Sequence, residues 1–72
     1  MKKTKKIKII LNGKLRSLQK STSVYDLMRS LKLSIDKVAI ELNKEIINKK
    51  TIKDIYLKNK DKVEIVHFIG GG

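Results

Sequence analysis

The stretch that decides the fold is KVEIVHFI at residues 62–69, and three glycines follow it at 70–72. β-branched and aromatic residues make up most of this stretch, and Val63 and Ile65 alternate with charged residues. Both features are typical of a β-strand with one face on a core. It is the strongest strand in the sequence, so the other elements are expected to assemble around it.

Residues 7–18 predict a β-hairpin. Ile7, Ile9 and Leu11 alternate with residues of the opposite face, and the pair that follows, Asn12–Gly13, can adopt the positive φ angles of a tight turn. The first strand of this hairpin can lie parallel beside residues 62–69 in the centre of a sheet.

The register of this hairpin depends on the length of its loop. A two-residue loop would set Arg16 opposite the inward-facing Ile9. A three-residue loop would instead set Ser17 opposite Ile9 and pair Leu15 with Leu11. We expect the three-residue loop, because it does not direct a cation at the core.

Residues 23–32 predict the one main helix. Its apolar residues fall at positions i, i+3, i+4 and i+7, and they are Val24, Leu27, Met28 and Leu31. The hydroxyl residues at 21–23 offer an N-cap. This apolar stripe is narrow, so the helix is expected to cover one face of the sheet and leave the other face open.

The remaining sequence predicts a third strand at 38–42, a short strand at 45–47 and a lysine-rich loop with one helical turn at 48–60. The expected fold is therefore α+β, a ubiquitin-like β-grasp with a mixed sheet of four to five strands and one main helix packed on one face. We expect a single domain at 1–69, preceded by a basic arm at 1–6 whose order the sequence leaves open, and a flexible glycine tail at 70–72.

The composition excludes several classes of function. The 72 residues contain no cysteine and one histidine, so neither a disulfide framework nor a thiolate or histidine metal site is expected. His67 and Glu64 fall on opposite faces of one strand and cannot form a catalytic pair. We expect no catalytic residue and no metal ligand, and therefore not an enzyme.

The high positive charge suggests nucleic-acid binding as an alternative function. The net charge is +11, but 16 of the 18 Lys and Arg residues are lysines and only three residues are aromatic. A solvated lysine-rich surface explains this balance more simply, so nucleic-acid binding is not expected. No apolar stretch approaches the roughly 20 residues of a membrane span, and the cytoplasm is the expected location.

The glycine tail is the feature of the sequence that indicates a function. A carrier needs a terminal peptide that enters the active site of another protein, and glycines let the backbone extend there without side-chain clashes. If the chain ends at Gly72, its carboxylate is a poor electrophile until a partner activates it.

The stretches at 38–47 and 63–72 resemble the sulfur carrier proteins of thiamine biosynthesis, the ThiS family, and the similarity runs from about Lys6 to Gly72. The resemblance implies that an adenylating enzyme of the ubiquitin-activating type uses ATP and Mg²⁺ to form an acyl adenylate on Gly72. A sulfur donor such as a cysteine desulfurase then converts it to a thiocarboxylate, and thiazole synthase takes the sulfur. The chain itself is expected to bind no cofactor and to be monomeric alone.

The sequence departs from this family at two loops. Lys60–Asp61 stands where the family often has Gly-Asp, and lysines replace a prolyl or arginyl segment near 48–50. Both departures put local turn shapes in question and leave the tail unchanged. A molybdopterin-synthase sulfur carrier, a ubiquitin-like protein modifier and a nucleic-acid-binding β-grasp module remain as alternatives.

Alternation also predicts a docking face. If Val63 and Ile65 face the helix, the residues that alternate with them face the uncovered side of the sheet. Residues of the neighbouring strands lie beside them on that side. Exposed apolar residues gathered on one face favour an interaction surface. The expected partner-binding residues are Ile10, Ala39, Glu64, Val66, Phe68 and Ile69, with Gly70, Gly71 and Gly72 entering the partner's active site.

Overall fold

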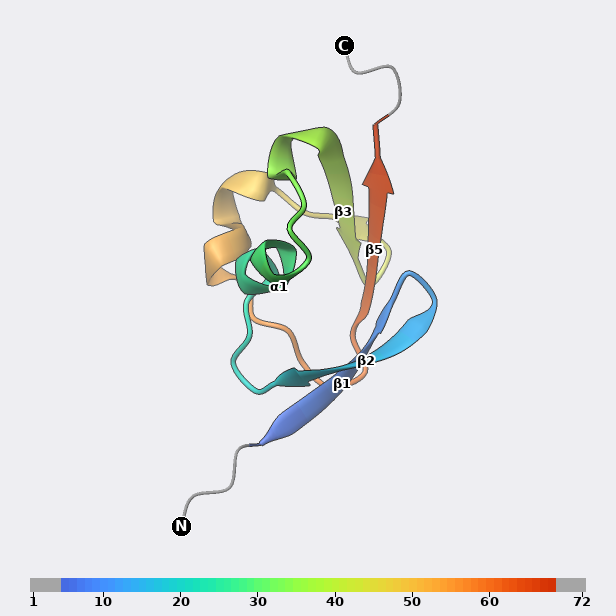
Figure 1. Ribbon diagram of the computed structural model, residues 1–72, viewed down its shortest axis with the longest axis vertical. Helices are drawn as coiled ribbons and strands as arrows, with labels where there is room; N and C mark the ends of the chain where they lie inside the picture. Colours follow the sequence, from blue (N-terminus) through green and yellow to red (C-terminus); the bar gives the residue numbers. More distant parts are fainter. Residues whose placement is uncertain (1–4, 69–72) are drawn as a thin grey trace.

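The computed structural model describes residues 5–68 and shows one helix packed on a five-stranded mixed sheet (Figure 1). This is the α+β, β-grasp arrangement that the sequence predicts. In chain order the elements are β1 (Lys6–Leu11), β2 (Lys14–Gln19), α1 (Val24–Ser30), η1 (Ile35–Lys37), β3 (Val38–Leu42), β4 (Glu45–Ile46), η2 (Lys49–Asp54) and β5 (Lys62–His67).

The last strand lies in the middle of the sheet, as expected. The strand order is β2-β1-β5-β3-β4, with β5 parallel to β1 and antiparallel to β3. Lys6 already belongs to β1, and the backbone carbonyl of Lys5 accepts a hydrogen bond from Lys20 N–H. The folded hairpin therefore includes the last two residues of the expected basic arm at 1–6.

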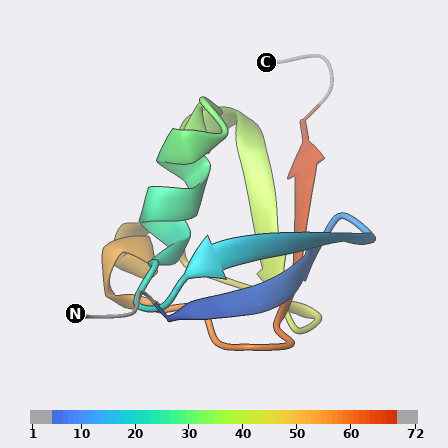
Figure 2. The ribbon, with the colours of Figure 1, turned by 60° about the horizontal axis from the view of Figure 1, so that its bottom comes forward.

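The core lies between the sheet and α1, which covers only one face of the sheet (Figure 2). Alternate residues of the central strands point into it, and α1 contributes the three buried positions expected from its apolar stripe. The buried apolar residues are Ile7, Ile9, Val24, Leu27, Met28, Val38, Ile40, Ile52, Leu57, Val63 and Ile65.

Both ends of α1 are fixed by local hydrogen bonds. The Ser23 hydroxyl accepts from Asp26 N–H at 3.0 Å, and the Asp26 carboxylate accepts from Ser23 N–H at 3.2 Å, which forms a capping box. At the other end Lys32 adopts φ 58° and its N–H bonds to the Arg29 carbonyl. This left-handed residue ends the helix at Ser30, two residues short of the expected boundary.

The expected register of the first hairpin is wrong. The turn contains two residues, Asn12 (φ 48°) and Gly13 (φ 82°), and Arg16 stands opposite Ile9. These angles suit the type I′ turn that two-residue hairpins favour. The cation is tolerated because β2 is an edge strand in which only Leu18 is even partly buried, so Arg16 stays in solvent.

Asn12 also ties the first hairpin to β5. Only two residue pairs join β1 and β5 in parallel, Ile10 with Lys62 and Leu11 with Val63. Beyond them the Asn12 side chain takes over the pairing: its Oδ1 accepts from Ile65 N–H at 2.8 Å, and its Nδ2 donates to the Ile65 carbonyl at 3.4 Å. The side-chain amide thus acts as one more peptide group of β1.

Asn43 does the same from the other side of β5. It lies in the β3–β4 turn with φ 52°, and its Oδ1 accepts from Lys62 N–H at 2.9 Å. Its Nδ2 donates to Asp61 Oδ1 at 3.0 Å, and its backbone N–H donates to the Lys62 carbonyl at 2.8 Å. Two left-handed asparagines, one from each turn, therefore hold β5.

The segment after β4 contains more helix than expected. Where the sequence predicts one helical turn in a loop, the six-residue η2 buries Ile52, and the following Leu57 is also in the core. The Asn48 side chain caps η2 by accepting from Lys50 N–H at 2.8 Å. The short η1 before β3 is not anticipated from the sequence at all.

We predict that replacing Asn12 destabilises the fold in two separable steps. Asn12→Gly keeps the left-handed turn but loses both bonds to Ile65, and it should lower the free energy of unfolding by about 1–2 kcal/mol. Asn12→Ala loses the same bonds and also replaces asparagine, which tolerates the left-handed region, by a residue that does not, which adds about 1 kcal/mol. Urea unfolding measures both values, and equal stability of the two variants and the parent would contradict the assignment.

A second prediction concerns Lys60, which adopts φ 76° in the turn before β5. The turn thus keeps a left-handed geometry although lysine stands where glycine is common in the resembling family. Lys60→Gly should raise the free energy of unfolding by about 0.5–1 kcal/mol by removing that strain. Lys58→Gly is the matched control, since Lys58 has no positive φ, and it should lower stability by a similar amount. The same sign of change in both variants would refute the explanation.

Candidate functional site

The face of the sheet that α1 leaves open carries the expected partner-binding residues that the structure describes. Val63 and Ile65 are buried toward the helix, so Glu64 and Val66 point the other way. Ala39 is the register partner of Val66 and lies on the same face. Val66 and Phe68 are 54% and 55% exposed, although both are large and apolar. Alternation along β5 thus produces an exposed apolar surface at the end of the strand.

Two more exposed apolar residues extend this open face toward both edges of the sheet. Ile46 of β4 is 74% exposed and pairs with Glu41, while Leu15 of β2 is 69% exposed and pairs with Ile10. Sequence reasoning missed Ile46 because β4 is too short to show alternation. It missed Leu15 because the expected register turned that residue toward the core.

A pair of carboxylates lies in the middle of the open face. Glu41 and Glu64 are direct register partners on the neighbouring strands β3 and β5. Like charges in this position destabilise a sheet unless a cation comes between them. The open face therefore combines apolar residues with a centre that favours a positively charged group.

The end of β5 is held by Lys49, a residue that sequence reasoning noted only as a loop substitution. Its Nζ donates to the carbonyls of Ile35 at 3.1 Å and Val38 at 2.9 Å. Because β4 pairs only with Glu41 and Leu42, the ammonium group replaces a strand partner for the first part of β3. No local sequence pattern indicates this contact.

The same ammonium group lies 5.3 Å from the centre of the Phe68 ring, within the range of a cation–π interaction. Phe68 N–H also donates to the Lys37 carbonyl at 3.0 Å. Phe68 is therefore fixed through both its backbone and its ring, although more than half of its surface is exposed. The expected site residues that follow, Ile69, Gly70, Gly71 and Gly72, lie outside the described residues.

Residues 5–68 contain no arrangement typical of a metal centre. Within this range no three His, Asp or Glu side chains lie close enough together to hold a metal ion. His67 and Glu64 are both exposed and point to opposite faces of β5. In the same part of the chain no helix is both long enough and apolar enough to cross a membrane. What the described surface offers is the open face of the sheet, with exposed apolar residues on and just after β5.

Comparisons with known proteins identify one family, and a solved structure from it has the same fold. The ThiS family model matches residues 9–72. The sulfur carrier protein ThiS of Bacillus subtilis is 44% identical over 63 residues, which cover 86% of this chain and 96% of that protein. The crystal structure of the thiamine biosynthesis protein ThiS from Geobacter metallireducens superposes with a TM-score of 0.80 at 30% identity, covering 92% of this chain and 100% of that chain.

Longer proteins also contain a segment similar to this chain. A thiazole synthase of Magnetococcus marinus is 38% identical over 66 residues, and one of Paramagnetospirillum magneticum is 39% identical over 66 residues. Each match covers 92% of this chain but only 20% of the synthase, so the chain spans about one fifth of these relatives. With a family model that matches most of its length and a full-length carrier as a relative, the chain belongs to the ThiS family of sulfur carrier proteins of thiamine biosynthesis.

Proposed function

We propose that the chain carries sulfur as a thiocarboxylate on Gly72 and delivers it for formation of the thiazole ring of the thiamine precursor. The observation that carries this proposal is the family match, which includes the glycine tail at 70–72. The geometry supports it, because the anchored Phe68 brings the exposed strand β5 to within two residues of Gly70. Folded structure thus leads almost directly into the reacting segment.

The proposed chemistry divides between this chain and its partners. An adenylating enzyme uses ATP and Mg²⁺ to convert the Gly72 carboxylate to an acyl adenylate with release of pyrophosphate. The persulfide sulfur of a donor such as a cysteine desulfurase then displaces AMP to form an acyl disulfide, and a thiol reductant cleaves the S–S bond to leave the thiocarboxylate. This chain contributes a backbone that fits a narrow channel, since glycine has no Cβ to clash with the walls. It has no cysteine that could attack the activated terminus.

Thiazole synthase is the proposed acceptor of the sulfur. Two proteins named thiazole synthase contain a segment similar to this chain within a longer polypeptide. Covalent linkage keeps two domains at an effective concentration in the millimolar range, which favours transfer between them. We infer that this chain meets a thiazole synthase through a surface that brings the two together for the same transfer.

The proposed docking surface is the open face of the sheet, with Ile10, Ala39, Glu64, Val66 and Phe68. Large exposed apolar side chains such as Val66 and Phe68 gain free energy when a partner covers them. The Glu41–Glu64 pair between the strands suits a basic residue of the partner. Ile69 and the glycines continue from this face into the active site.

The mechanism predicts a defined change in mass. Incubation with the adenylating enzyme, ATP, Mg²⁺, a cysteine desulfurase with cysteine and a thiol reductant should replace one oxygen of the chain by sulfur, as measured by intact-mass spectrometry. A variant that lacks Gly72 is the control and should remain unchanged. Absence of the exchange in the parent chain, or its persistence in the control, would refute the proposal.

The docking face predicts a loss of affinity without a loss of stability. Phe68→Ala should weaken binding to the thiazole synthase by roughly tenfold or more, because a covered aromatic side chain is often a binding hot spot. Isothermal titration calorimetry measures the affinity. Tyr56→Ala is the matched control, since Tyr56 is an aromatic residue with a similar exposure of 54% that pairs with Ser23 rather than with the strands of the open face. Equal effects of both substitutions would contradict the assignment of the face.

A further inference from the structure

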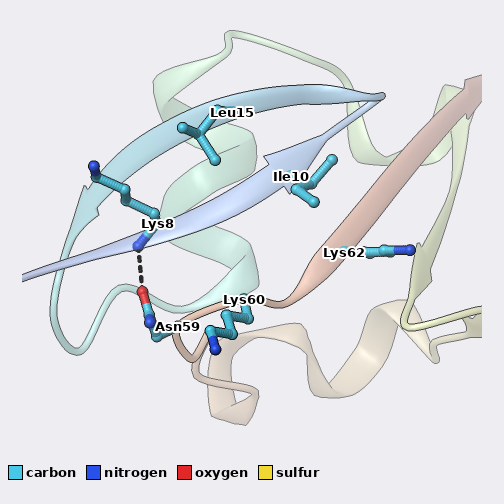
Figure 3. Close-up of a pocket in the computed structure, with 6 residues that line it drawn as sticks. All are labelled: Lys8, Ile10, Leu15, Asn59, Lys60 and Lys62. Carbon is cyan, nitrogen blue, oxygen red and sulfur yellow. Dashed lines mark hydrogen bonds between the residues drawn. The ribbon is translucent and has the colours of Figure 1, made fainter.

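A pocket lies at the end of the open face that is remote from the tail. Its volume is about 450 Å³, and it lies where β1, β2, the turn before β5 and the start of β5 meet (Figure 3). The residues that line it are Lys8, Ile10, Leu15, Asn59, Lys60 and Lys62.

The floor of the pocket is apolar. Ile10 and Leu15 are register partners on β1 and β2, so their side chains lie next to each other on the open face. Leu15 is 69% exposed, which leaves an aliphatic surface uncovered at the edge of the sheet. A single apolar side chain of another molecule could cover both residues.

Three lysines surround this floor, and Figure 3 shows them on different sides of the two aliphatic side chains. Their backbones are held in place by hydrogen bonds. Lys8 N–H donates to Asn59 Oδ1 at 2.8 Å, and Lys60 N–H donates to the Lys8 carbonyl at 2.7 Å. Lys62 is the parallel register partner of Ile10. The fold therefore fixes the backbone positions of the three lysines around the pocket.

The residues that line the pocket include no carboxylate. The nearest acidic residue along the chain, Asp61, uses its oxygens to accept from Asn43 Nδ2 at 3.0 Å and Lys58 N–H at 2.7 Å. Glu64 follows Lys62 on the same face of β5 and marks the boundary toward the carboxylate pair. The open face thus has a basic end at the pocket and an acidic centre.

We infer that this lysine pocket docks an acidic segment of the thiazole synthase, with one apolar side chain seated on Ile10 and Leu15 and carboxylates facing the lysines. The inference rests on the proposed function for the identity of the partner. Charge complementarity selects an acidic partner. No aromatic residue lines the pocket, which disfavours single-stranded nucleic acid because its bases need stacking partners.

The position of the lysine pocket on β5 indicates how docking there would help transfer. Phe68 lies six positions after Lys62, the first residue of β5, and six positions span about 20 Å in an extended strand. A partner that binds the lysine pocket and also receives the tail contacts the carrier at two distant points. Two such contacts fix the direction of β5 relative to the partner, whereas the tail alone would leave the carrier free to rotate.

The test compares two triple variants with the same change in net charge. The pocket variant is Lys8→Glu, Lys60→Glu and Lys62→Glu. The control is Lys20→Glu, Lys32→Glu and Lys50→Glu, whose side chains are exposed and do not line the pocket. Calorimetric titration against the thiazole synthase of the same organism should show at least tenfold weaker binding for the pocket variant and less than threefold for the control. The difference should shrink at high salt.

Two further variants keep the result interpretable. If the pocket variant does not fold, as judged by circular dichroism, replacement of the same lysines by glutamine should still weaken binding more than the matching glutamine control. Leu15→Ser should weaken binding while leaving every charge in place. The inference would be overturned if Leu15→Ser left the affinity unchanged and the two charge variants lowered it equally, because the affinity would then depend on total charge alone.

The remaining outcomes separate this inference from the proposed function. A pocket variant that binds the synthase as tightly as the parent, while Gly72 still acquires sulfur, overturns the pocket and leaves the carrier function intact. Pocket-specific binding to the synthase without any sulfur on Gly72 supports the pocket and refutes the carrier chemistry. Loss of oligonucleotide binding in the pocket variant, with binding to the synthase unchanged, would assign the lysines to nucleic acid instead.

Discussion

The parallel pairing of β1 with β5 is the contact on which the rest of the structure depends. It joins the two ends of the sequence in the centre of the sheet through only two register pairs, Ile10 with Lys62 and Leu11 with Val63. Asn12 extends the pairing with its side-chain amide, and Asn43 holds the other side of β5. Because α1 covers one face of this arrangement, the alternate residues of β5 must face solvent. The core and the open face are two consequences of one strand placement.

The site follows from the same placement. β5 enters the sheet beside the lysine pocket and ends at His67, and Lys49 and Lys37 hold the ring and the backbone of the next residue, Phe68. One strand therefore connects the lysine pocket, a pair of carboxylates and an exposed apolar end. In the proposed function, this strand presents the glycine tail and the partner enzymes supply the chemistry.

Local sequence patterns predicted the helix and strands whose formation depends on interactions between residues close in the sequence. Alternation in residues 62–69 identified β5 and its two faces, the i, i+3, i+4, i+7 spacing identified α1, and the resemblance of the tail identified the family. The hairpin register failed because a position opposite a buried residue was assumed to be buried, whereas Arg16 on the edge strand is not. The amide contacts of Asn12, which cross 53 positions, and the carbonyl contacts of Lys49 require the folded chain and leave no signal in the sequence.

The most direct test of the account is amide chemical-shift mapping of the isotope-labelled chain with unlabelled thiazole synthase. If the open face is the docking surface, the shifts or line broadening should concentrate on the amides of Ala39, Val66 and Phe68 and at Lys60 and Lys62. The amides of α1, which lie on the far side of the sheet, should change little. Perturbations that concentrate on α1 and η2 and spare β5 would contradict the account.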